Sequence, residues 1–268
     1  MRIERVAMKK TLLHTLPFAV PHELEQFVSG AQVYDSSCSP EARVYFLDKD
    51  GGYYLKAAKK GGLQKEAQMT AYFRSLGLGA EVLDYISGEC DLLLTAKLSG
   101  EDCLCEEYIS NPERLCDTIA QQLRKLHELD YTGCPVADRT AEYISTVEAN
   151  YRKGICDLQL FSGCYEFASP QEAKRIFDSG KSALKRDALL HGDYCLPNIM
   201  LNRWKPSGFI DLGCGGVGDR HIDLFWGTWT LWFNLKTTRY KQRFLDAYGR
   251  DKVEEEMLEI IAAAEVFG

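Results

Sequence analysis

The sequence predicts an α+β fold of two lobes, in which a small antiparallel-sheet lobe precedes a larger, mostly helical one. Short runs of β-branched and aromatic residues dominate the first hundred residues, whereas the rest of the chain carries apolar residues at helical spacing. A chain of 268 residues, 46% of them hydrophobic, is long enough for one large core or two modest ones. We therefore place the first lobe at 1–97 and the second at 98–268, with a ligand expected in the cleft between them.

The first lobe is expected to consist of two strands, a helix and two more strands. Asp50-Gly51-Gly52 supplies suitable hairpin chemistry between the first two strands, and Gly77 ends the helix. In chain order, the predicted elements are strands at 43–47 and 53–57, a helix at 65–76, and strands at 82–86 and 92–95.

The second lobe is expected to be helical, with one compact hairpin. Its first helix begins with Asn111 as N-cap and Pro112 at the first helical position, a favourable pair at a helix start. The hairpin pairs 199–201 with 208–210 and turns through 205–207. Further helices are predicted at 140–152, 170–184, 222–233, 240–248 and 252–266.

Composition and charge limit the kinds of partner. The formal net charge is −7 and no stripe of lysine and arginine occurs, which argues against nucleic acid or an anionic membrane and favours a cationic small molecule. The ten cysteines include no C-x-x-C pair, so we interpret them as reduced thiols. Because we find neither a signal-peptide pattern nor about 20 consecutive apolar residues, we expect a cytoplasmic protein. We also expect either a monomer or a weak homodimer.

The sharpest motif is HGDYCLPN at 191–198, followed after the hairpin by FIDLG at 209–213. Asn198 precedes the first hairpin strand and Asp211 follows the second. Antiparallel pairing should therefore bring an amide oxygen and a carboxylate side by side. Hard oxygen ligands of this kind suit Mg²⁺, which takes the rest of its shell from water and phosphates.

Asp193 lies on the loop before the same hairpin, where a carboxylate can accept the proton of an attacking hydroxyl. A base followed by an asparagine and an aspartate matches the arrangement that eukaryotic-type kinases use for phosphoryl transfer. The alternative is a set of turn-forming residues with ordinary local hydrogen bonds. We expect His191 to organise this loop, and Asp223 to accept backbone N–H groups of the loop or to cap the following helix.

The first lobe should supply a lysine for the phosphates, and Lys56 stands in a predicted strand. Alternation puts Tyr54 on the same face, so an aromatic surface for adenine and an ammonium for phosphate point the same way. Glu66 lies on the apolar stripe of the next helix and is expected to face inward, where it needs a cationic partner such as Lys56. The alternatives are a solvated edge lysine and an exposed helical glutamate.

The likeness to a known family covers nearly the whole chain. HGDYCLPNIML and GFIDLGCGGVGDRHIDL resemble the catalytic loop and the metal-binding segment of aminoglycoside 3'-phosphotransferases. Softer matches are SPEARVYFL, YYLK, LLLTA, LRKLHELD and the ending AEVFG. The resemblance implies a two-lobed, protein-kinase-like fold, with ATP or GTP as the phosphoryl donor and Mg²⁺ as the metal.

The resemblance also implies a role for each matching position. Asp193 would be the catalytic base, and Asn198 and Asp211 would be the magnesium ligands. Lys56, paired with Glu66, would contact the α- and β-phosphates. The rest of the nucleotide site would comprise Tyr54 stacking on adenine, Ser39 in a nucleotide-positioning loop, and backbone groups of the hinge from Thr95 to Lys97.

The substrate-binding positions follow the family pattern only in part. By resemblance, Glu265 and the terminal carboxylate would hold ammonium groups of the drug, with Phe267 beside them. The relatives carry two adjacent acids after the metal segment, whereas this chain has Phe233 and Asn234 at what we judge to be the same positions. Fewer carboxylates weaken the attraction for a polyamine. Glu166 is a further candidate, either lining the substrate pocket or lying on a solvated face.

These features predict transfer of the ATP γ-phosphate to a hydroxyl of a small cationic molecule, in the first place the 3'-hydroxyl of an aminoglycoside, with antibiotic resistance as the result. One alternative is a kinase of another hydroxyl compound, such as a choline-like amine, a macrolide or a different antibiotic. Trp226, Trp229, Trp232 and Phe233 could line such a pocket or pack against the core. A further alternative, a nucleotide-binding pseudoenzyme, is disfavoured by the intact base and metal ligands.

Overall fold

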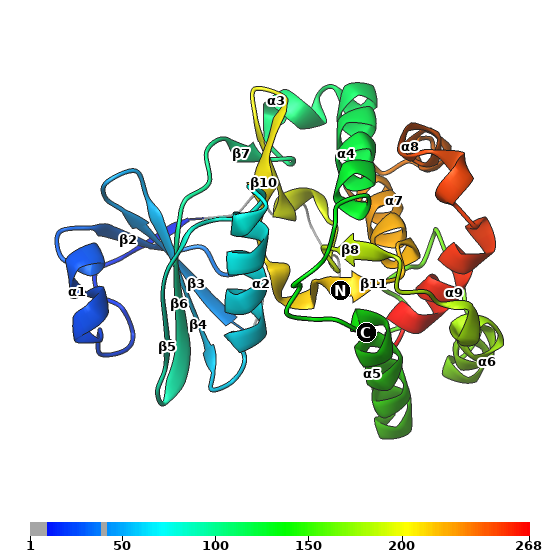
Figure 1. Ribbon diagram of the computed structural model, residues 1–268, viewed down its shortest axis with the longest axis horizontal. Coiled ribbons are helices and arrows are strands. Elements are labelled where there is room, and N and C mark those ends of the chain that lie inside the picture. Colours follow the sequence, from blue (N-terminus) through cyan, green and yellow to red (C-terminus); the bar gives the residue numbers. More distant parts are fainter. Residues whose placement is uncertain (1–9, 39–41) are drawn as a thin grey trace. The chain divides into compact units, whose positions relative to one another are not determined.

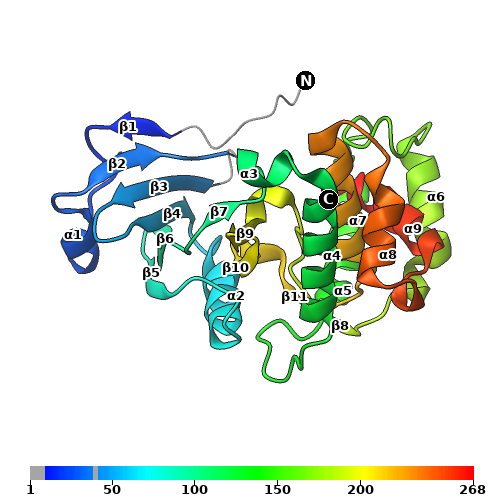
Figure 2. The same ribbon diagram turned by 90° about the horizontal axis from the view of Figure 1, so that it is seen from above.

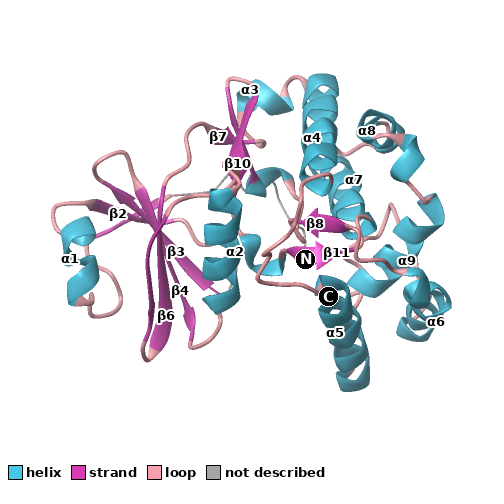
Figure 3. Ribbon diagram, in the orientation of Figure 1, coloured by secondary structure: helices cyan, strands magenta, loops and turns pink. Residues whose placement is uncertain are grey.

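The computed structural model describes residues 10–38 and 42–268, so the expected nucleotide-loop residue Ser39 lies outside the described residues. The chain divides into two compact units. The first unit comprises the residues up to Glu101 together with Met200–Gly213, and the second comprises Asp102–Ile199 and Cys214–Gly268. Figure 3 shows strands prominent in the first unit and helices prominent in the second, as the α+β prediction requires.

The first unit is built on a six-stranded antiparallel sheet (Figure 1). Its strand order is β1-β2-β3-β4-β6-β5, so consecutive strands pair except where β6 lies between β4 and β5. The strands are β1 (Thr11–Leu13), β2 (Gln32–Asp35), β3 (Ala42–Asp48), β4 (Tyr53–Lys59), β5 (Val82–Ser87) and β6 (Cys90–Ala96).

The two faces of this sheet are covered by different helices (Figure 1). Helix α1 (His22–Val28) packs Leu24 onto one face, where strand residues such as Leu55 form the main core. Helix α2 (Gln64–Ser75) packs Ala67 onto the other face, against Leu93. Because successive side chains of a strand point to opposite faces, β4 directs Leu55 toward α1 and its neighbours 54 and 56 toward α2.

A hairpin distant in sequence completes the first unit. Strands β9 (Ile199–Asn202) and β10 (Lys205–Phe209) form a three-stranded sheet with β7 (Glu101–Asp102), in the order β10-β9-β7. The Phe209 N–H donates to the Leu78 carbonyl at 2.8 Å. This contact fixes the end of β10 against the segment after α2. It therefore also restrains the residues that follow Phe209 in the chain.

The turn of this hairpin is not where the sequence placed it. The prediction of a turn at 205–207 is wrong, because these residues belong to β10. The chain reverses instead at Arg203 and Trp204, whose φ angles are 50° and 67°, the left-handed region that a tight two-residue turn requires. Pro206 is tolerated because β10 is an edge strand and needs no ladder donor on its outer side.

The second unit is mainly helical and is centred on α7 (Figure 2). Helix α7 contacts α4, α8 and α9, and most of its side chains are buried. A short antiparallel pair, β8 (Ala188–Leu190) with β11 (Gly216–Gly218), flanks the motif loop. The helices are α3 (Glu106–Ile109), α4 (Pro112–His127), α5 (Arg139–Lys153), α6 (Pro170–Gly180), α7 (His221–Leu235), α8 (Tyr240–Tyr248) and α9 (Glu255–Glu265). No helix among the described residues combines the length and the apolar character needed to cross a bilayer.

Candidate active site

In the first unit, one ammonium group lies between two carboxylates. Nζ of Lys56 on β4 is 2.9 and 2.8 Å from the two carboxylate oxygens of Glu66 on α2, so the ion pair expected from the sequence is present. The same nitrogen is 2.8 Å from Oδ1 of Asp211, which follows β10. The sequence did not indicate this second contact, which joins residues far apart in the chain.

Asp211 is held in an unusual backbone conformation. Its φ is 58°, in the left-handed region that aspartate tolerates better than most residues with a side chain. The strand β10 ends two residues earlier, so the left-handed residue turns the chain sharply out of the hairpin. The side chain remains half exposed, at 51%, although Lys56 contacts one of its oxygens. A carboxylate that is both oriented and accessible is suited to bind a cation.

The charges around Lys56 determine its protonation. Burial alone would lower the pKa of Lys56, but the carboxylates of Asp211 and Glu66 outweigh it and raise that pKa above its usual range. Burial raises the pKa of Glu66, and the charge of Asp211 adds to this while Lys56 opposes it. Two carboxylates thus share one ammonium, and a further positive charge brought to Asp211 would relieve their repulsion.

The face of the sheet that carries Lys56 also carries two aromatic rings. Tyr54 packs against Phe46 with 5.1 Å between ring centroids, and Phe46 pairs with Tyr54 across β3 and β4. The Lys10 ammonium lies 3.6 Å from the centroid of the Phe46 ring. Sequence reasoning singled out Tyr54 and missed Phe46, although the hairpin register through Asp50-Gly51-Gly52 would have placed the two rings opposite each other.

The expected hinge segment is at the end of β6. Thr95 pairs with Tyr54 in the sheet. The N–H of Ala96 donates to the Glu81 carbonyl, and the N–H of Lys97 donates to the Gly52 carbonyl. These two backbone donors are therefore already engaged within the first unit and are not available to a base in this conformation.

In the second unit, Asp223 of α7 fixes the start of the 191–198 loop. Its two carboxylate oxygens accept the backbone N–H groups of His191 at 2.8 Å and Gly192 at 2.7 Å. The prediction that Asp223 accepts backbone N–H groups of this loop is confirmed. Gly192 has φ 85°, and a Cβ there would lie 1.9 Å from the Cys214 carbonyl oxygen, so no larger residue fits.

The same loop orients Asp193 and Asn198. The Asn198 side-chain amide donates to Oδ2 of Asp193 at 2.8 Å and to its carbonyl at 3.0 Å. The Asp193 N–H donates to Nδ1 of His191 at 3.2 Å, which gives His191 the organising contact expected for it. Since the amide nitrogen of Asn198 faces Asp193, its amide oxygen is directed away from that carboxylate.

The donor set fits magnesium. An asparagine amide oxygen and an aspartate carboxylate are hard oxygen ligands of the kind that Mg²⁺ takes from proteins. Among the described residues, no group of three or more His, Cys, Asp or Glu side chains could hold a metal ion. Mg²⁺ commonly takes one or two protein carboxylates and completes its shell with water and phosphates, so Asn198 and Asp211 are sufficient in kind.

Glu265, near the end of α9, is a buried carboxylate in the second unit. Its Oε1 accepts the Tyr143 hydroxyl at 2.9 Å and the indole N–H of Trp226 at 3.1 Å. Burial raises the pKa of Glu265 to about 7, against these two hydrogen bonds and the Arg139 charge, and Asp193 contributes in the same direction as burial. Tyr143 and Trp226 are partners that sequence reasoning did not assign to Glu265. A carboxylate so poised would be favoured in its charged form by any cation brought near it.

The remaining expected substrate residues differ in their surroundings. Phe267 is buried and packs edge-on against Tyr151, with 5.5 Å between centroids. Asn234 is buried within α7 and donates to the Thr230 carbonyl at 2.8 Å and to its hydroxyl at 3.1 Å. Glu166 is exposed. Beside Asn234, the ring of Phe233 stacks on another aromatic residue of α7.

This aromatic row follows α7. Trp229 stacks on Phe233 with 4.8 Å between centroids and a 16° interplanar angle, and it meets Trp226 edge-on at 5.2 Å. Phe161 packs edge-on against both tryptophans. The three α7 residues are half-buried rather than fully enclosed. They therefore combine packing against the unit with some accessible aromatic surface.

Comparison with protein-family models matches residues 39–260 to the phosphotransferase enzyme family, APH. The chain belongs to this family. It is also 48% identical to a protein of Lactococcus lactis subsp. lactis named "Probable aminoglycoside 3'-phosphotransferase", over 92% of this chain and 95% of that one. An aminoglycoside 3'-phosphotransferase of Niallia circulans is 27% identical over 77% of this chain and 84% of its own length. The family resemblance inferred from the sequence is confirmed.

Solved structures of this phosphotransferase family share the fold. A crystal structure of an aminoglycoside-3'-phosphotransferase of type VIII has a TM-score of 0.72 at 23% identity, and the match covers 92% of this chain and all of that one. The phosphotransferase APH(3'')-Id of Streptomyces rimosus, in complex with ADP and streptomycin, has a TM-score of 0.67 at 22% identity, covering 83% of this chain and 90% of that one. These matches confirm the kinase-like fold class.

Proposed function

We propose that this phosphotransferase moves the γ-phosphate of ATP to the 3'-hydroxyl of an aminoglycoside antibiotic and thereby confers resistance. The observation that carries the proposal is the oriented Asp193–Asn198 pair in the 191–198 loop. A second supporting observation is the Lys56 ammonium of the first unit, which lies between the carboxylates of Glu66 and Asp211. The 48% identical relative, whose name includes this activity, supports the choice of acceptor.

In the proposed reaction, the acceptor oxygen attacks the γ-phosphorus while the bond from that phosphorus to the β,γ-bridging oxygen breaks and ADP leaves. The Asp193 carboxylate accepts the hydroxyl proton, and Asn198 holds it in place through its amide N–H. Lys56 contacts the α- and β-phosphates, and Glu66 fixes the ammonium. Mg²⁺, held by Asn198 and Asp211, would neutralise phosphate charge when bound.

The nucleotide base is assigned to the face of the first-unit sheet that carries Lys56. Tyr54 would stack on adenine, and Phe46 extends the aromatic surface beside it. The segment from Thr95 to Lys97 would border the base. Because the N–H groups of Ala96 and Lys97 already bond to carbonyls, we expect other backbone groups of this segment to recognise the base. The role of Ser39 stays a prediction from sequence.

The cationic acceptor is assigned to the second unit, where Glu265 supplies a buried carboxylate. An ammonium group bound there would replace the unfavourable burial of an isolated negative charge with an ion pair. Phe267 would support this end of the chain through its packing on Tyr151. The substrate roles of Asn234 and Glu166 stay predictions.

The aromatic residues of α7 favour a second acceptor class. Phe233, at one of the two positions where relatives were expected to carry acids, stacks on Trp229. A macrolide has fewer ammonium groups and a larger apolar surface than a polyamine, and a choline-like amine could place its single cation over an aromatic face. Either would suit this surface better than a polyamine. We retain it as the alternative function.

ATP is plentiful inside cells, which supports a cytoplasmic location. The net charge of −7 supports a small cationic partner rather than nucleic acid or an anionic membrane. A monomer or weak homodimer stays a prediction.

The proposal is tested with the purified protein in a coupled ATPase assay with kanamycin, neomycin, choline and erythromycin, followed by mass analysis of each product. We expect a phosphorylated aminoglycoside and no product from Asp193→Ala, a loss of several kcal/mol in transition-state stabilisation. Nucleotide affinity should stay within about twofold of the native value, because Asp193 is assigned no nucleotide contact. Retained turnover by Asp193→Ala would refute its role, and phosphorylation of erythromycin or choline alone would favour the alternative.

A further inference from the structure

Asp223 is itself held by a buried group outside the 191–198 loop. Nε2 of His127, the last residue of α4, lies 3.2 Å from Oδ2 of Asp223, the same oxygen that accepts the His191 N–H. The side chains of His127 and Asp223 are both fully buried. The ring therefore approaches a carboxylate that holds the backbone of the loop carrying Asp193.

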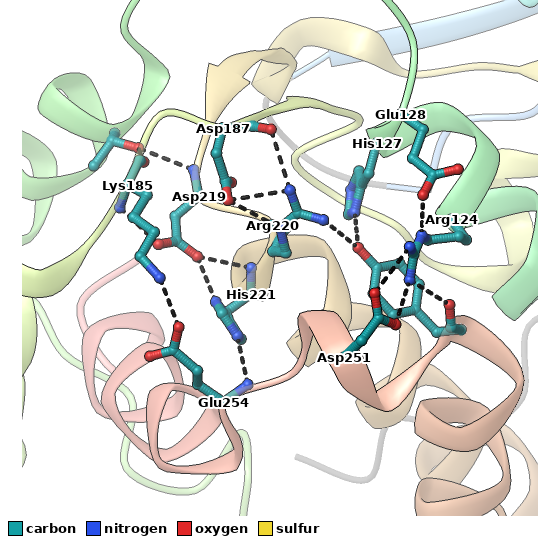
Figure 4. A network of polar contacts seen from close by, with 12 residues as sticks. Arg124, His127, Glu128, Lys185, Asp187, Asp219, Arg220, His221, Asp251 and Glu254 are labelled. Atoms are coloured by element: carbon teal, nitrogen blue, oxygen red, sulfur yellow. Dashed lines mark hydrogen bonds and ion pairs between the residues drawn. The ribbon is translucent and has the colours of Figure 1, made fainter.

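The other nitrogen of the ring continues the chain of contacts (Figure 4). Nδ1 of His127 lies 2.8 Å from the Tyr248 hydroxyl, and a guanidinium nitrogen of Arg220 lies 3.2 Å from the same hydroxyl oxygen. Arg220 is in turn 3.1 Å from the Asp187 carboxylate. All of these groups belong to the second unit.

The chemistry of the end groups fixes the direction of every hydrogen bond. A guanidinium only donates, so the Tyr248 oxygen accepts from Arg220. An ionised carboxylate only accepts, so Nε2 of His127 must carry the proton that Asp223 receives. A neutral imidazole has one donor and one acceptor nitrogen, so with the proton on Nε2 the other nitrogen, Nδ1, accepts the Tyr248 O–H.

The protonation states of His127 and Tyr248 agree with these hydrogen-bond directions. Burial lowers the pKa of His127 even though Asp223 acts in the opposite direction, and the Arg220 charge adds to the lowering. Burial raises the pKa of Tyr248 to about 12 against the Arg220 charge, so the phenol keeps its proton. The ring is accordingly neutral near pH 7.

We propose that His127 is a positioning residue for phosphoryl transfer: as the neutral tautomer protonated on Nε2, it orients Asp223, which fixes the 191–198 loop and thereby Asp193. This inference rests on the proposed role of Asp193 as the base. His127 contacts no reacting group in the proposal. Its effect is confined to the orientation of the carboxylate that both loop N–H groups share.

Two replacements of His127 separate positioning from simple packing. Glutamine carries its amide nitrogen near the place of Nε2 and can still donate to Asp223. Asparagine reaches only to the place of Nδ1, so it can accept from Tyr248 but leaves Asp223 without this donor. Both variants replace the same buried imidazole with a carboxamide, so they are matched in polarity.

We expect His127→Asn to lower kcat about 100-fold, the scale of loss that a displacement of about 1 Å in a catalytic group produces. The KM for ATP should change little, and His127→Gln should keep kcat within about tenfold of the native value. Equal kcat values for the two folded variants would overturn the proposal, as would a loss confined to KM.

A measurement on the native protein keeps the proposal testable if the asparagine variant does not fold. With ¹⁵N-labelled histidine, the His127 signals, assigned from the glutamine variant among the five histidines, should show the Nε2–H tautomer and no titration between about pH 6 and 8. An Nδ1–H tautomer or an imidazolium would refute the proposal. Turnover by Asp193→Ala would instead refute the proposed role of Asp193 as the base while leaving this spectrum unchanged.

Discussion

Replacement of Glu265 by glutamine should change how the stability of the protein depends on pH. Glutamine keeps an oxygen that can accept from Tyr143 and Trp226, so the two hydrogen bonds to this position can persist. What the replacement removes is a titration. Burial raises the pKa of Glu265 from 4.5 to about 7 in the folded chain, whereas the unfolded chain returns it to the ordinary value.

The sign follows from which state binds the proton more tightly. The folded state holds the Glu265 proton more firmly, so its contribution to stability is fully present below about pH 4.5 and is lost as pH rises through about 7. A shift from 4.5 to about 7 corresponds to roughly 3 kcal/mol in total. Most of this, about 2 to 3 kcal/mol, is lost between pH 5 and pH 8.

The assay is urea denaturation of the native protein and of Glu265→Gln at several values across this range. The difference in unfolding free energy between the two proteins isolates the one titration, because the other ionisable groups are common to both. We expect the variant to gain about 2 to 3 kcal/mol relative to the native protein as pH rises from 5 to 8. A difference that stays constant with pH would refute the reasoning.

The same carboxylate predicts a signature of substrate binding. A bound ammonium group stabilises ionised Glu265, so binding near pH 7 should release part of a proton. Calorimetric titration with an aminoglycoside in two buffers of different ionisation enthalpy measures that proton directly. Glu265→Gln serves as the control, and an equal release from the variant would assign the proton to another group.

Two further replacements address the remaining charges of the site. Lys56→Met should reduce kcat/KM for ATP by roughly 10-fold to 100-fold, because it removes a charge-assisted contact and leaves Glu66 and Asp211 unpaired. Steady-state kinetics with ATP as the varied substrate measure this reduction. An unchanged kcat/KM would contradict the phosphate role of Lys56. Asn234→Asp should destabilise the fold by about 1 to 3 kcal/mol, because a buried carboxylate cannot donate to the Thr230 carbonyl. Thermal unfolding measures this loss of stability. A gain in aminoglycoside affinity at unchanged stability would instead support a direct substrate role for position 234.

The parts of the site that could be predicted from sequence are those fixed by local geometry. Strand alternation and helix periodicity were enough to propose the contact between Lys56 and Glu66, which are ten residues apart. The contact between Lys56 and Asp211 spans 155 residues and depends on how the β9–β10 hairpin packs beside α2. No pattern within a single element carries that information.

The prediction of the β9–β10 turn was wrong for a different reason. Pro206 and Ser207 are common in turns, and the sequence between the strands gave no glycine or asparagine pair at the observed reversal. Arg203 and Trp204 adopt left-handed conformations that their side chains do not favour. The surrounding sheet therefore determines the turn against local preference, which a reading of residue types cannot anticipate.

Asn234, an expected substrate position, also contacts a residue that holds the 191–198 loop. Its amide bonds the carbonyl and the hydroxyl of Thr230, and that hydroxyl also accepts the Leu196 N–H of the 191–198 loop at 3.1 Å. With two donors directed at it, the Thr230 oxygen has its lone pairs engaged, so α7 holds the loop here as well as at Asp223. An acid at position 234 would lose the donor and place a charge beside a carbonyl. The absence of an acid at this position and the support of the 191–198 loop are thus two results of the same asparagine.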